Sequence, residues 1–501
     1  MILFSSLLLF SLQVTPVASA VAAGSASQDV EERLRDARDL LGRDREPEVH
    51  AGMRICVELD SPASVELLLE TMRLTQDRTL SAAHYRDVSW EGLVQIKDLY
   101  AKRVVEAELN KNKKSAWMRQ WCAETLGIYG DYDFGTSLTK ALRDKELLVR
   151  SAAARALGRI KYKPAQKELK KLIKNKDVFV RANAIEAMAL LDPEANEELY
   201  LKGLRDKDGG VRCALLATAS EAYPEQVEAI SVEALGDEDW RPRVQALENL
   251  SKVKTKTAVD ALIGALEDGR PVVAARSVTA LQILTGERHT KADIWKRWWA
   301  DNRESFSVPE GGAGRVRSTA GKTETAFNGI KLESDHVAFL IDKSTAMSEP
   351  LSSRGMSKDA AAHEELKGVF DKLEGRLVFN IFCYEMRVKP FEDRAVKLTK
   401  SVSRKALDFH RKTAISGRKD IWAALMAVVD NPDLDTAYLL SSGEPDVGEY
   451  VHWNRVTYQL KEINRFHKVI FHTIAYSDNQ WYRDQLEKIA EVTGGDFAWF
   501  E

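Results

Sequence analysis

The chain has 501 residues, enough for two to four domains with sizeable cores. Its 73 basic and 76 acidic side chains give a formal net charge of −3, so nothing in the charge points to nucleic acid or a membrane surface as partner. The four cysteines are few and lie far apart, and no Cys/His spacing typical of zinc occurs, so we expect buried free thiols rather than a disulfide framework. They are Cys56, Cys122, Cys213 and Cys383.

Residues 1–20 have the pattern of a signal peptide. The segment is apolar through Leu12 and ends in Ala18-Ser19-Ala20, a small-x-small sequence that signal peptidases accept, although no Lys or Arg precedes the apolar run. A retained anchor or a wrong start site is the alternative. No other run approaches the ~18 apolar residues that span a bilayer. We therefore expect an exported protein (periplasmic, cell-envelope or extracellular) with no integral membrane segment after cleavage.

Residues 29–114 read as helical but keep no fixed period. The apolar spacing in 63–74 and 90–108 is typical of amphipathic helices. We interpret this segment as irregular N-terminal or capping repeats of the more regular array that follows it.

From residue 115 the chain repeats itself with a period of 31 residues. An arginine opens each unit, a small residue usually follows three places later, and a mostly large apolar residue follows seven places later. Residues four apart share one face of a helix, so each unit presents a face that packs closely against its neighbour. Four of the five residues standing four places before the arginines are good N-caps, so the inner helix of each unit begins there. The arginines are Arg119, Arg150, Arg181, Arg212 and Arg243, and the residues before them are Ser115, Glu146, Asp177, Asp208 and Asp239.

A helix pair of this length cannot bury its apolar face alone, so the units must stack into a solenoid. The unit, clearest in DVFVRANAIEAM, resembles a HEAT repeat over about residues 115–285. We expect the repeated arginines to bridge neighbouring repeats, with the Asp four residues earlier as a ready partner; a basic binding stripe is the alternative. The WKRWW sequence at 295–299 predicts an aromatic cap, rather than a ligand cage, so that the solenoid occupies 115–304.

A Gly-, Ser- and Thr-rich segment within 305–333 predicts a flexible linker, and residues 334–501 alternate between strand and helix patterns. Apolar strands separated by helices predict a doubly wound, mostly parallel sheet, which binds ligands beyond the carboxyl ends of its strands. We expect strands at 336–342, 376–384, 436–442, 469–476 and 496–500, a weaker edge strand near 395–398, and helices at 358–373, 404–412, 420–429, 452–466 and 481–493.

Three sequences in this second domain resemble a von Willebrand factor A domain: FLIDKSTAM at the first strand, SGRKDIWAAL before a central helix, and LLSSGEPDVGE after a central strand. Together with upstream HEAT repeats, WKRWW and FNGIKLESD, they resemble a group of exported bacterial proteins. The predicted fold class is therefore multidomain, an all-α HEAT solenoid followed by an α/β doubly wound (Rossmann-like) domain of the von Willebrand A type.

The resemblance implies a divalent-cation site with oxygen ligands from D-x-S-x-S, from a Thr and from a second Asp. Asp342 and Ser344 match the first two positions, but Ala346, Lys419 and Ser442 stand at the other three. We therefore expect no metal and no other cofactor, and the hypothesis is that Lys419 pairs with Asp342 as an internal substitute for the cation. Lys419 pointing to solvent is one alternative. The other is a rescued site for Mg or Ca, and the oxygen-bearing side chains near it in the pattern are Thr345, Ser416, Glu444 and Asp446.

No P-loop, GxSxG, GxGxxG or His spacing typical of catalysis occurs, so we expect no enzyme. The expected function is a protein–protein interaction scaffold. Its solenoid would offer a concave surface to proteins or peptides, and loops around Asp342, Lys419 and Glu444 would bind an acidic side chain of a protein partner without a cation. Three alternatives stay open: a cation-dependent adhesion module with an atypical ligand set, an enzyme-associated subunit, and a domain that only packs against the solenoid.

Overall fold

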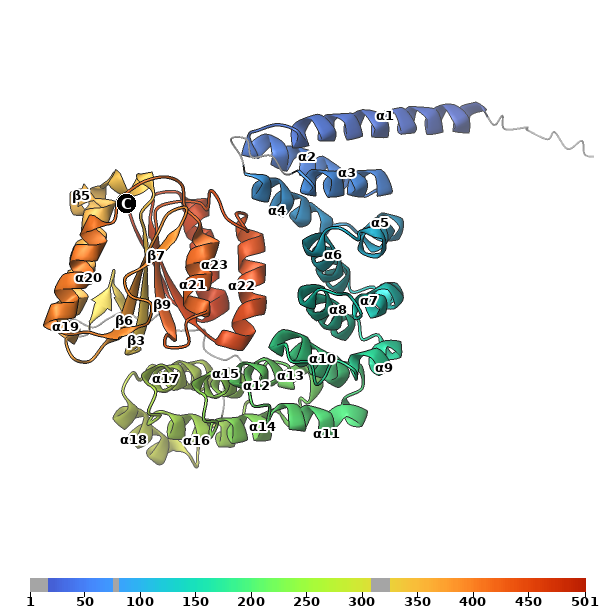
Figure 1. The fold of residues 1–501 in the computed structure, drawn as a ribbon. Coiled ribbons are helices and arrows are strands. Elements are labelled where there is room, and N and C mark those ends of the chain that lie inside the picture. The colour runs from blue at the N-terminus through green and yellow to red at the C-terminus, as the bar shows by residue number, and fades with distance from the viewer. Residues whose placement is uncertain (1–16, 75–80, 308–324) are drawn as a thin grey trace, which may run out of the picture.

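The chain forms a curved stack of helices and an α/β domain, and the stack curves around the domain (Figure 1). The computed structural model describes residues 17–74, 81–307 and 325–501, with side chains from residue 28 onward. The prediction of helical repeats followed by an α/β domain is confirmed. The helices of the stack are α1 (Val17–Leu41), α2 (Glu46–Leu59), α3 (Pro62–Met72), α4 (Ala82–Leu93), α5 (Leu99–Lys111), α6 (Ala116–Tyr129), α7 (Gly135–Ala141), α8 (Leu147–Arg159), α9 (Gln166–Leu169), α10 (Val178–Leu191), α11 (Pro193–Gly203), α12 (Gly209–Leu216), α13 (Ala219–Ala222), α14 (Val227–Ala234), α15 (Trp240–Leu250), α16 (Lys256–Ala265), α17 (Pro271–Thr285) and α18 (Ala292–Asn302).

The predicted signal peptide, residues 1–20, lies outside the described residues except for 17–20, which begin α1. Export and cleavage therefore stay predictions. Within the described part of the chain, no helix combines the length and the apolar composition that crossing a bilayer requires.

The inner helices of the regular repeats are α6, α8, α10, α12, α15 and α17, and each packs on the next. The predicted N-caps are confirmed at four of the five positions, because Ser115, Asp177, Asp208 and Asp239 each accept a hydrogen bond from a backbone N–H in the first turn. Glu146 makes no such bond. These caps fix where each inner helix begins, and so set the phase of the stack.

The repeated arginines bridge neighbouring repeats as predicted, but with a different carboxylate. Arg181 donates two hydrogen bonds to Asp206, 25 residues later, at 2.7 and 3.0 Å, and another to the carbonyl of Asn175. The Asp four residues earlier is not the partner, because its carboxylate caps its own helix. Asp206 also accepts a hydrogen bond from the backbone N–H of Asp208, so it orders the next turn as well. The same pairing joins Arg119 to Asp144, Arg212 to Asp237 and Arg243 to Asp268.

Replacing Arg181 by alanine is expected to lower the free energy of unfolding by about 3 kcal/mol, because it leaves a nearly buried carboxylate without its cation. Arg150 is a matched control. The residue 25 places later is Asn175, and Arg150 donates to the carbonyls of Asp144 and Lys145. Arg150→Ala is expected to cost about 1 kcal/mol. Chemical unfolding of the full chain measures the loss of stability in both variants. Equal losses would contradict the claim that pairing with Asp206 makes Arg181 the more important residue.

The tryptophan cluster closes the end of the stack, as predicted. Trp295 of α18 is fully buried and Trp299 is 5% exposed, and both pack into the apolar core formed by α15, α16 and α17. The indole N–H of Trp299 donates to Asp260 of α16 at 2.7 Å. The aromatic cap thus covers the last repeat, where no further repeat follows.

All four cysteines are buried free thiols, which confirms the sequence-based expectation. Burial raises the pKa of Cys56, Cys213 and Cys383 to about 12. These thiols are therefore protonated core side chains and poor nucleophiles.

The α/β domain begins earlier than the predicted boundary at 334. Most of the predicted linker, residues 308–324, lies outside the described residues, but β1 (Ala326–Phe327) and β2 (Ile330–Lys331) already form an antiparallel hairpin. Asn328 and Gly329 have φ values of 50° and 77°, the left-handed conformation that an Asn-Gly hairpin turn requires. Phe327 is buried against Phe339 and Tyr438, so the hairpin belongs to the core of the domain.

The central sheet has seven strands in the order β11-β10-β9-β3-β6-β7, with β8 also paired to β6. Pairs from β11 to β6 are parallel, whereas β7 and β8 run antiparallel to β6, so the predicted mostly parallel sheet is confirmed. β8 is the expected weak edge strand; β7, only three residues long, was not predicted. The strands are β3 (His336–Asp342), β6 (Val378–Tyr384), β7 (Val388–Pro390), β8 (Val396–Lys397), β9 (Thr436–Ser441), β10 (Ile470–Tyr476) and β11 (Phe497–Phe500), and a separate hairpin joins β4 (Pro350–Leu351) to β5 (Met356–Ser357).

Helices cover both faces of this sheet (Figure 1). Side chains alternate along β3, so that Phe339 and Ile341 pack toward α19, whereas Ala338 and Leu340 pack toward α21 and α22. The face toward α21, α22 and α23 is the one that also meets the solenoid. The helices of the domain are α19 (Lys358–Leu373), α20 (Lys400–Lys412), α21 (Ile421–Val429), α22 (Trp453–His467) and α23 (Gln480–Thr493).

Helix α22 lies along the inner side of the solenoid from α4 to α15. Side chains of the solenoid form hydrogen bonds with backbone groups at both ends of α22. Asp87 of α4 accepts hydrogen bonds from the backbone N–H groups of Val451 and His452, at 2.6 and 2.9 Å. At the other end, the guanidinium of Arg241 in α15 donates to the carbonyl of Phe466 at 3.1 Å. Acidic groups near the N-terminus and basic groups near the C-terminus also favour the helix dipole. Two helices of the solenoid therefore fix the position of α22.

Apolar side chains of the solenoid and of the α/β domain pack against one another. One buried cluster contains side chains of α6, α8 and α10 together with side chains of α21, α22 and α23. At α12, a Cβ atom added to Gly210 would lie 2.9 Å from the carbonyl oxygen of Phe466, so only glycine allows this close approach. The domain packs against the solenoid in the structure. The alternative of a domain that only packs there and binds nothing else stays a prediction. The expected concave surface for outside partners is, along α22, occupied by the protein's own domain.

Candidate functional site

The carboxyl edge of the sheet brings the first predicted site residues together. Asp342 ends β3 and Ser442 follows β9, and because these two strands are neighbours the two side chains meet. Asp342 is fully buried and accepts hydrogen bonds from the backbone N–H of Ser344 at 2.7 Å, from the backbone N–H of Ser442 at 3.0 Å, and from the Ser442 hydroxyl at 2.6 Å. The carboxylate is thus held by donors of the chain itself.

Lys419 does not pair with Asp342, so the hypothesis of an internal ammonium substitute at that carboxylate is wrong. Its Nζ lies 3.6 Å from Oδ2 of Asp446 and next to Gly443, where an added Cβ would be 3.1 Å away. The side chain is only 7% exposed, so it does not point to solvent either. The backbone N–H of Lys419 also donates to the Asp446 carboxylate, at 3.2 Å. Lys419 therefore joins the loop before α21 to the loop after β9.

The other predicted site residues are buried to different degrees. Ser344 is buried with its hydroxyl 3.5 Å from that of Ser442, and Ala346 is half-buried in the short helical turn that follows. Glu444 is half-buried, and Glu46 of α2 is among the neighbouring carboxylates that raise its pKa. Burial is the main reason why the pKa of Glu444 is raised to about 7, and neighbouring carboxylates add to the rise.

A buried lysine that sequence reasoning passed over holds the first loop. Lys343 is fully buried, and its Nζ donates to Asp359 at 2.6 Å and to the carbonyl of His410 at 2.8 Å. Its backbone carbonyl accepts from the N–H of Ser416. The loop after β3 is therefore tied to α19, to α20 and to the loop before α21, which makes this edge of the sheet rigid.

A second group of functional-type side chains lies where α2 and α4 of the solenoid meet the N-terminus of α22. One ligand atom from each of His50, Glu91 and His452 lies within 4.8 Å of the other two, and Glu46, His50 and His84 form a second such group. The ring centroids of His50 and His452 are 5.2 Å apart. Sequence analysis found no His spacing of this kind, because the residues come from three helices separated by up to some 400 positions. The docking of the domain adds His452 to side chains that α2 and α4 already hold close together.

The contact between solenoid and domain also buries charge. Arg455 of α22 is fully buried, pairs with Glu124 of α6 at 2.8 Å and lies over the rings of Trp90 and Trp121. About two turns further along, Glu462 accepts hydrogen bonds from Arg155 and Arg159 of α8. Beside these pairs lies a cavity of about 320 Å³ lined by both parts of the chain. The interface therefore combines specific ion pairs with incomplete packing.

Comparisons with known proteins support the repeat assignment. The protein-family model of HEAT repeats matches residues 135–200 and 197–282, so the chain contains HEAT repeats. No curated protein matches the chain significantly.

Solved structures give weak likenesses to each part of the chain. The complex of CpcE and CpcF of phycocyanin lyase from Nostoc sp. is 17% identical, with 47% of this chain and 94% of that chain covered and a TM-score of 0.31. A von Willebrand factor type A protein from Catenulispora acidiphila is 15% identical over 34% of this chain and 40% of that chain, with a TM-score of 0.28. Human deoxyhypusine hydroxylase is 16% identical over 51% of this chain and 97% of that chain, with a TM-score of 0.24.

Proposed function

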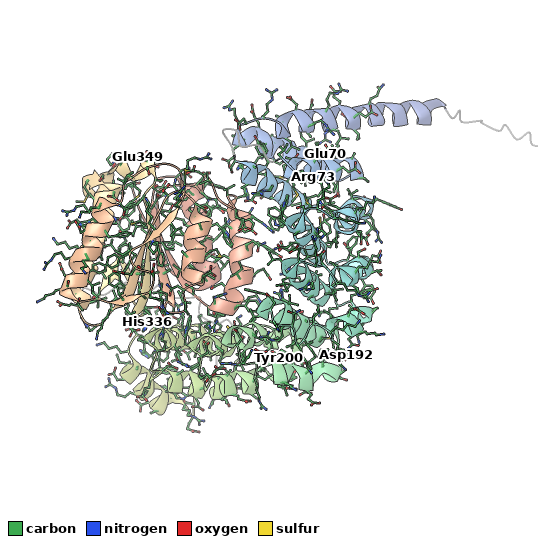
Figure 2. The ribbon with its side chains drawn as sticks, in the orientation of Figure 1. Glu70, Arg73, Asp192, Tyr200, His336 and Glu349 are labelled. Atoms are coloured by element: carbon green, nitrogen blue, oxygen red, sulfur yellow. The ribbon has the colours of Figure 1, made fainter. Side chains whose placement is uncertain are left out.

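We propose that this protein is a non-catalytic, exported interaction scaffold whose α/β domain is a von Willebrand factor A-type domain that binds a protein partner without a metal ion. HEAT repeats support the scaffold role, because stacked repeats present extended surfaces to other proteins. The domain lies on the inner side of the solenoid and keeps its carboxyl edge, marked by Glu349, at the opposite end of β3 from His336 (Figure 2).

The observation that carries the proposal is the hydrogen bonding of Asp342. Its carboxylate is buried and accepts three hydrogen bonds, one of them from the Ser442 hydroxyl at the position where the family has a second acidic ligand. Ala346 has no oxygen in its side chain, and the ammonium of Lys419 lies against the same loop, beside Gly443. A positive charge beside this loop also opposes the binding of a cation there. These residues do not fit a magnesium site, which needs near-octahedral oxygen ligands.

The partner surface that we infer is the exposed rim of this edge. Thr345, Ser416 and Gly417 are exposed, and Met386 beside them is 55% exposed. Arg418 is half-buried and donates to the carbonyl of Asp446, so its guanidinium supplies the positive charge for an acidic side chain of the partner. Lys419, which the sequence favoured for this role, is too buried for it. Direct charge pairing at the rim takes the place of a metal-mediated contact.

Magnesium titration of the full chain tests the metal-free proposal. The unchanged protein is expected to show no saturable binding and no rise in melting temperature, because Asp342 is already hydrogen-bonded. The triple variant Ala346→Ser, Lys419→Thr, Ser442→Asp restores the family's ligands and is expected to gain magnesium binding with a Kd of about 1 mM or tighter. Ser442→Ala, which removes the hydroxyl without adding a ligand, is the control. Magnesium binding by the unchanged chain would overturn the proposal.

A second candidate role is favoured by the packing of α22: the domain braces the solenoid and binds nothing else. A photo-crosslinking residue at Thr345 distinguishes the two roles in cells that produce the protein. The scaffold proposal expects one discrete crosslinked partner from Thr345 that persists in EDTA, and none from Tyr100, which is 77% exposed on α5. An absence of any partner from Thr345 would favour the bracing role.

A further inference from the structure

The junction between the solenoid and the α/β domain gathers three potential metal ligands from three helices. His50 belongs to α2, Glu91 to α4, and His452 is the N-cap residue of α22. One ligand atom of each lies within 4.8 Å of the other two. Tetrahedral zinc, with bonds of about 2.0–2.2 Å, needs ligand atoms about 3.3 Å apart. Binding of zinc therefore requires these side chains to rotate closer together, and His50 and Glu91 are half-buried rather than fully enclosed.

Three buried polar atoms at the junction have no hydrogen-bond partner among the described residues. Nε2 of His452 lies 3.0 Å from Oε2 of Glu91, yet this carboxylate oxygen is buried and accepts no hydrogen bond. The side chain of His452 is only 8% exposed, and its Nδ1 atom has no hydrogen-bond partner either. Nε2 of His84, which belongs to the adjoining group, is also buried without a hydrogen-bond partner. Buried polar atoms without partners are costly, and several at one point indicate a missing common partner.

The donor types select the ion. Two imidazoles and one carboxylate suit zinc and its first-row neighbours, whereas magnesium and calcium prefer oxygen alone. Glu46 and His84 lie next to His50 and can supply a fourth ligand or a hydrogen bond to one.

We propose that the junction binds one divalent transition-metal ion of the zinc class, held by His50, Glu91 and His452. The ion joins the N-terminal end of the solenoid to the N-cap residue of α22, and so strengthens the closed arrangement at the end opposite to Arg241. The inference goes beyond the proposed function, which concerns the carboxyl edge of the sheet and requires no metal there.

Zinc chloride titrated into the chelator-stripped full chain tests the site, with binding followed by calorimetry and stability by thermal unfolding. We expect one ion per chain with a Kd below about 1 µM and a melting temperature that rises by several degrees. His50→Gln and Glu91→Gln are each expected to weaken binding at least about tenfold and to remove the thermal shift. His336→Gln, at the far end of β3, is the matched control and is expected to bind zinc as the unchanged chain does (Figure 2).

Two results would overturn this proposal. One is the absence of saturable zinc binding by the unchanged chain. The other is unaltered affinity in both His50→Gln and Glu91→Gln, with circular dichroism confirming that these variants fold. Magnesium in large excess is expected not to displace zinc, because the ligands differ in type. The zinc result and the magnesium result at Asp342 are therefore independent, and either proposal can fail alone.

Discussion

Replacing Arg455 by alanine is expected to lower the free energy of unfolding of the full chain by about 4 kcal/mol. The guanidinium is fully buried between the two parts of the chain and pairs with Glu124 at 2.8 Å. Its Cζ atom lies 4.0 Å from the ring centroid of Trp121 and 4.4 Å from that of Trp90, and both rings belong to the solenoid. The alanine variant loses these cation–π contacts, creates a cavity, and leaves Glu124 without its cation.

Chemical unfolding of the full chain measures this loss, and Arg483→Ala is a matched control. Arg483 also lies over an aromatic ring, with Cζ 3.9 Å from the centroid of Trp499, but this pair is within the α/β domain and Trp499 is 47% exposed. The control is expected to cost about 1 kcal/mol or less. A loss at Arg455 no larger than at Arg483 would contradict the claim that charge buried between solenoid and domain stabilises the chain.

Glu462→Gln is expected to destabilise the full chain by about 3 kcal/mol at neutral pH. Burial by itself raises the pKa of Glu462, but Arg155, Arg159 and Arg465 outweigh burial and bring it to about 2. Because the pKa in the folded state lies below that in the unfolded state, the ionised carboxylate stabilises the fold above about pH 4.5. This contribution is lost as the pH falls toward about 2.

The pH dependence distinguishes this mechanism from a general loss of packing. The difference in stability between the unchanged chain and Glu462→Gln is expected to be full at pH 7 and to shrink steadily below pH 4.5, as denaturant titrations at several pH values would measure. Glu491→Gln, at an exposed position on α23, is the control and is expected to have little effect at any pH. A difference that stays constant between pH 7 and pH 3 would contradict the role of the three arginines.

Local patterns allowed much of the fold to be predicted. The bounds of β3 and α19 match the predicted ranges, and the caps at Asp177 and Asp208 lie where the repeat places them. Each of these features depends on residues within a few positions of one another, where helix capping and side-chain alternation act. The Asn328-Gly329 hairpin also had a local signal, the Asn-Gly pair itself, although it lies within the predicted linker 305–333.

Contacts between distant residues could not be predicted in the same way. The carboxylates that pair with the repeated arginines lie 25 residues later in the chain. The repeat period alone does not predict which carboxylate is the partner of each arginine. Along α22, the charged residues Arg455 and Glu462 look like a solvent-facing surface in the sequence, because burial of such groups depends on complementary charges elsewhere. The cluster at His50 and His452 exists only because α22 docks against α2 and α4. The positions of Asp342 and Ser442 followed from strand order, whereas the pairing of Lys419 with Asp446 did not.

The docking of the α/β domain inside the solenoid creates the buried interface along α22, and small-angle X-ray scattering of the full chain at neutral pH measures this docking directly. We expect a single compact particle whose scattering curve fits the closed arrangement of Figure 1, unchanged by added magnesium. The expected curve does not depend on protein concentration, because the contacts of α22 are within one chain. A curve that requires two separated bodies joined by a tether would contradict the docking and the interface built on it.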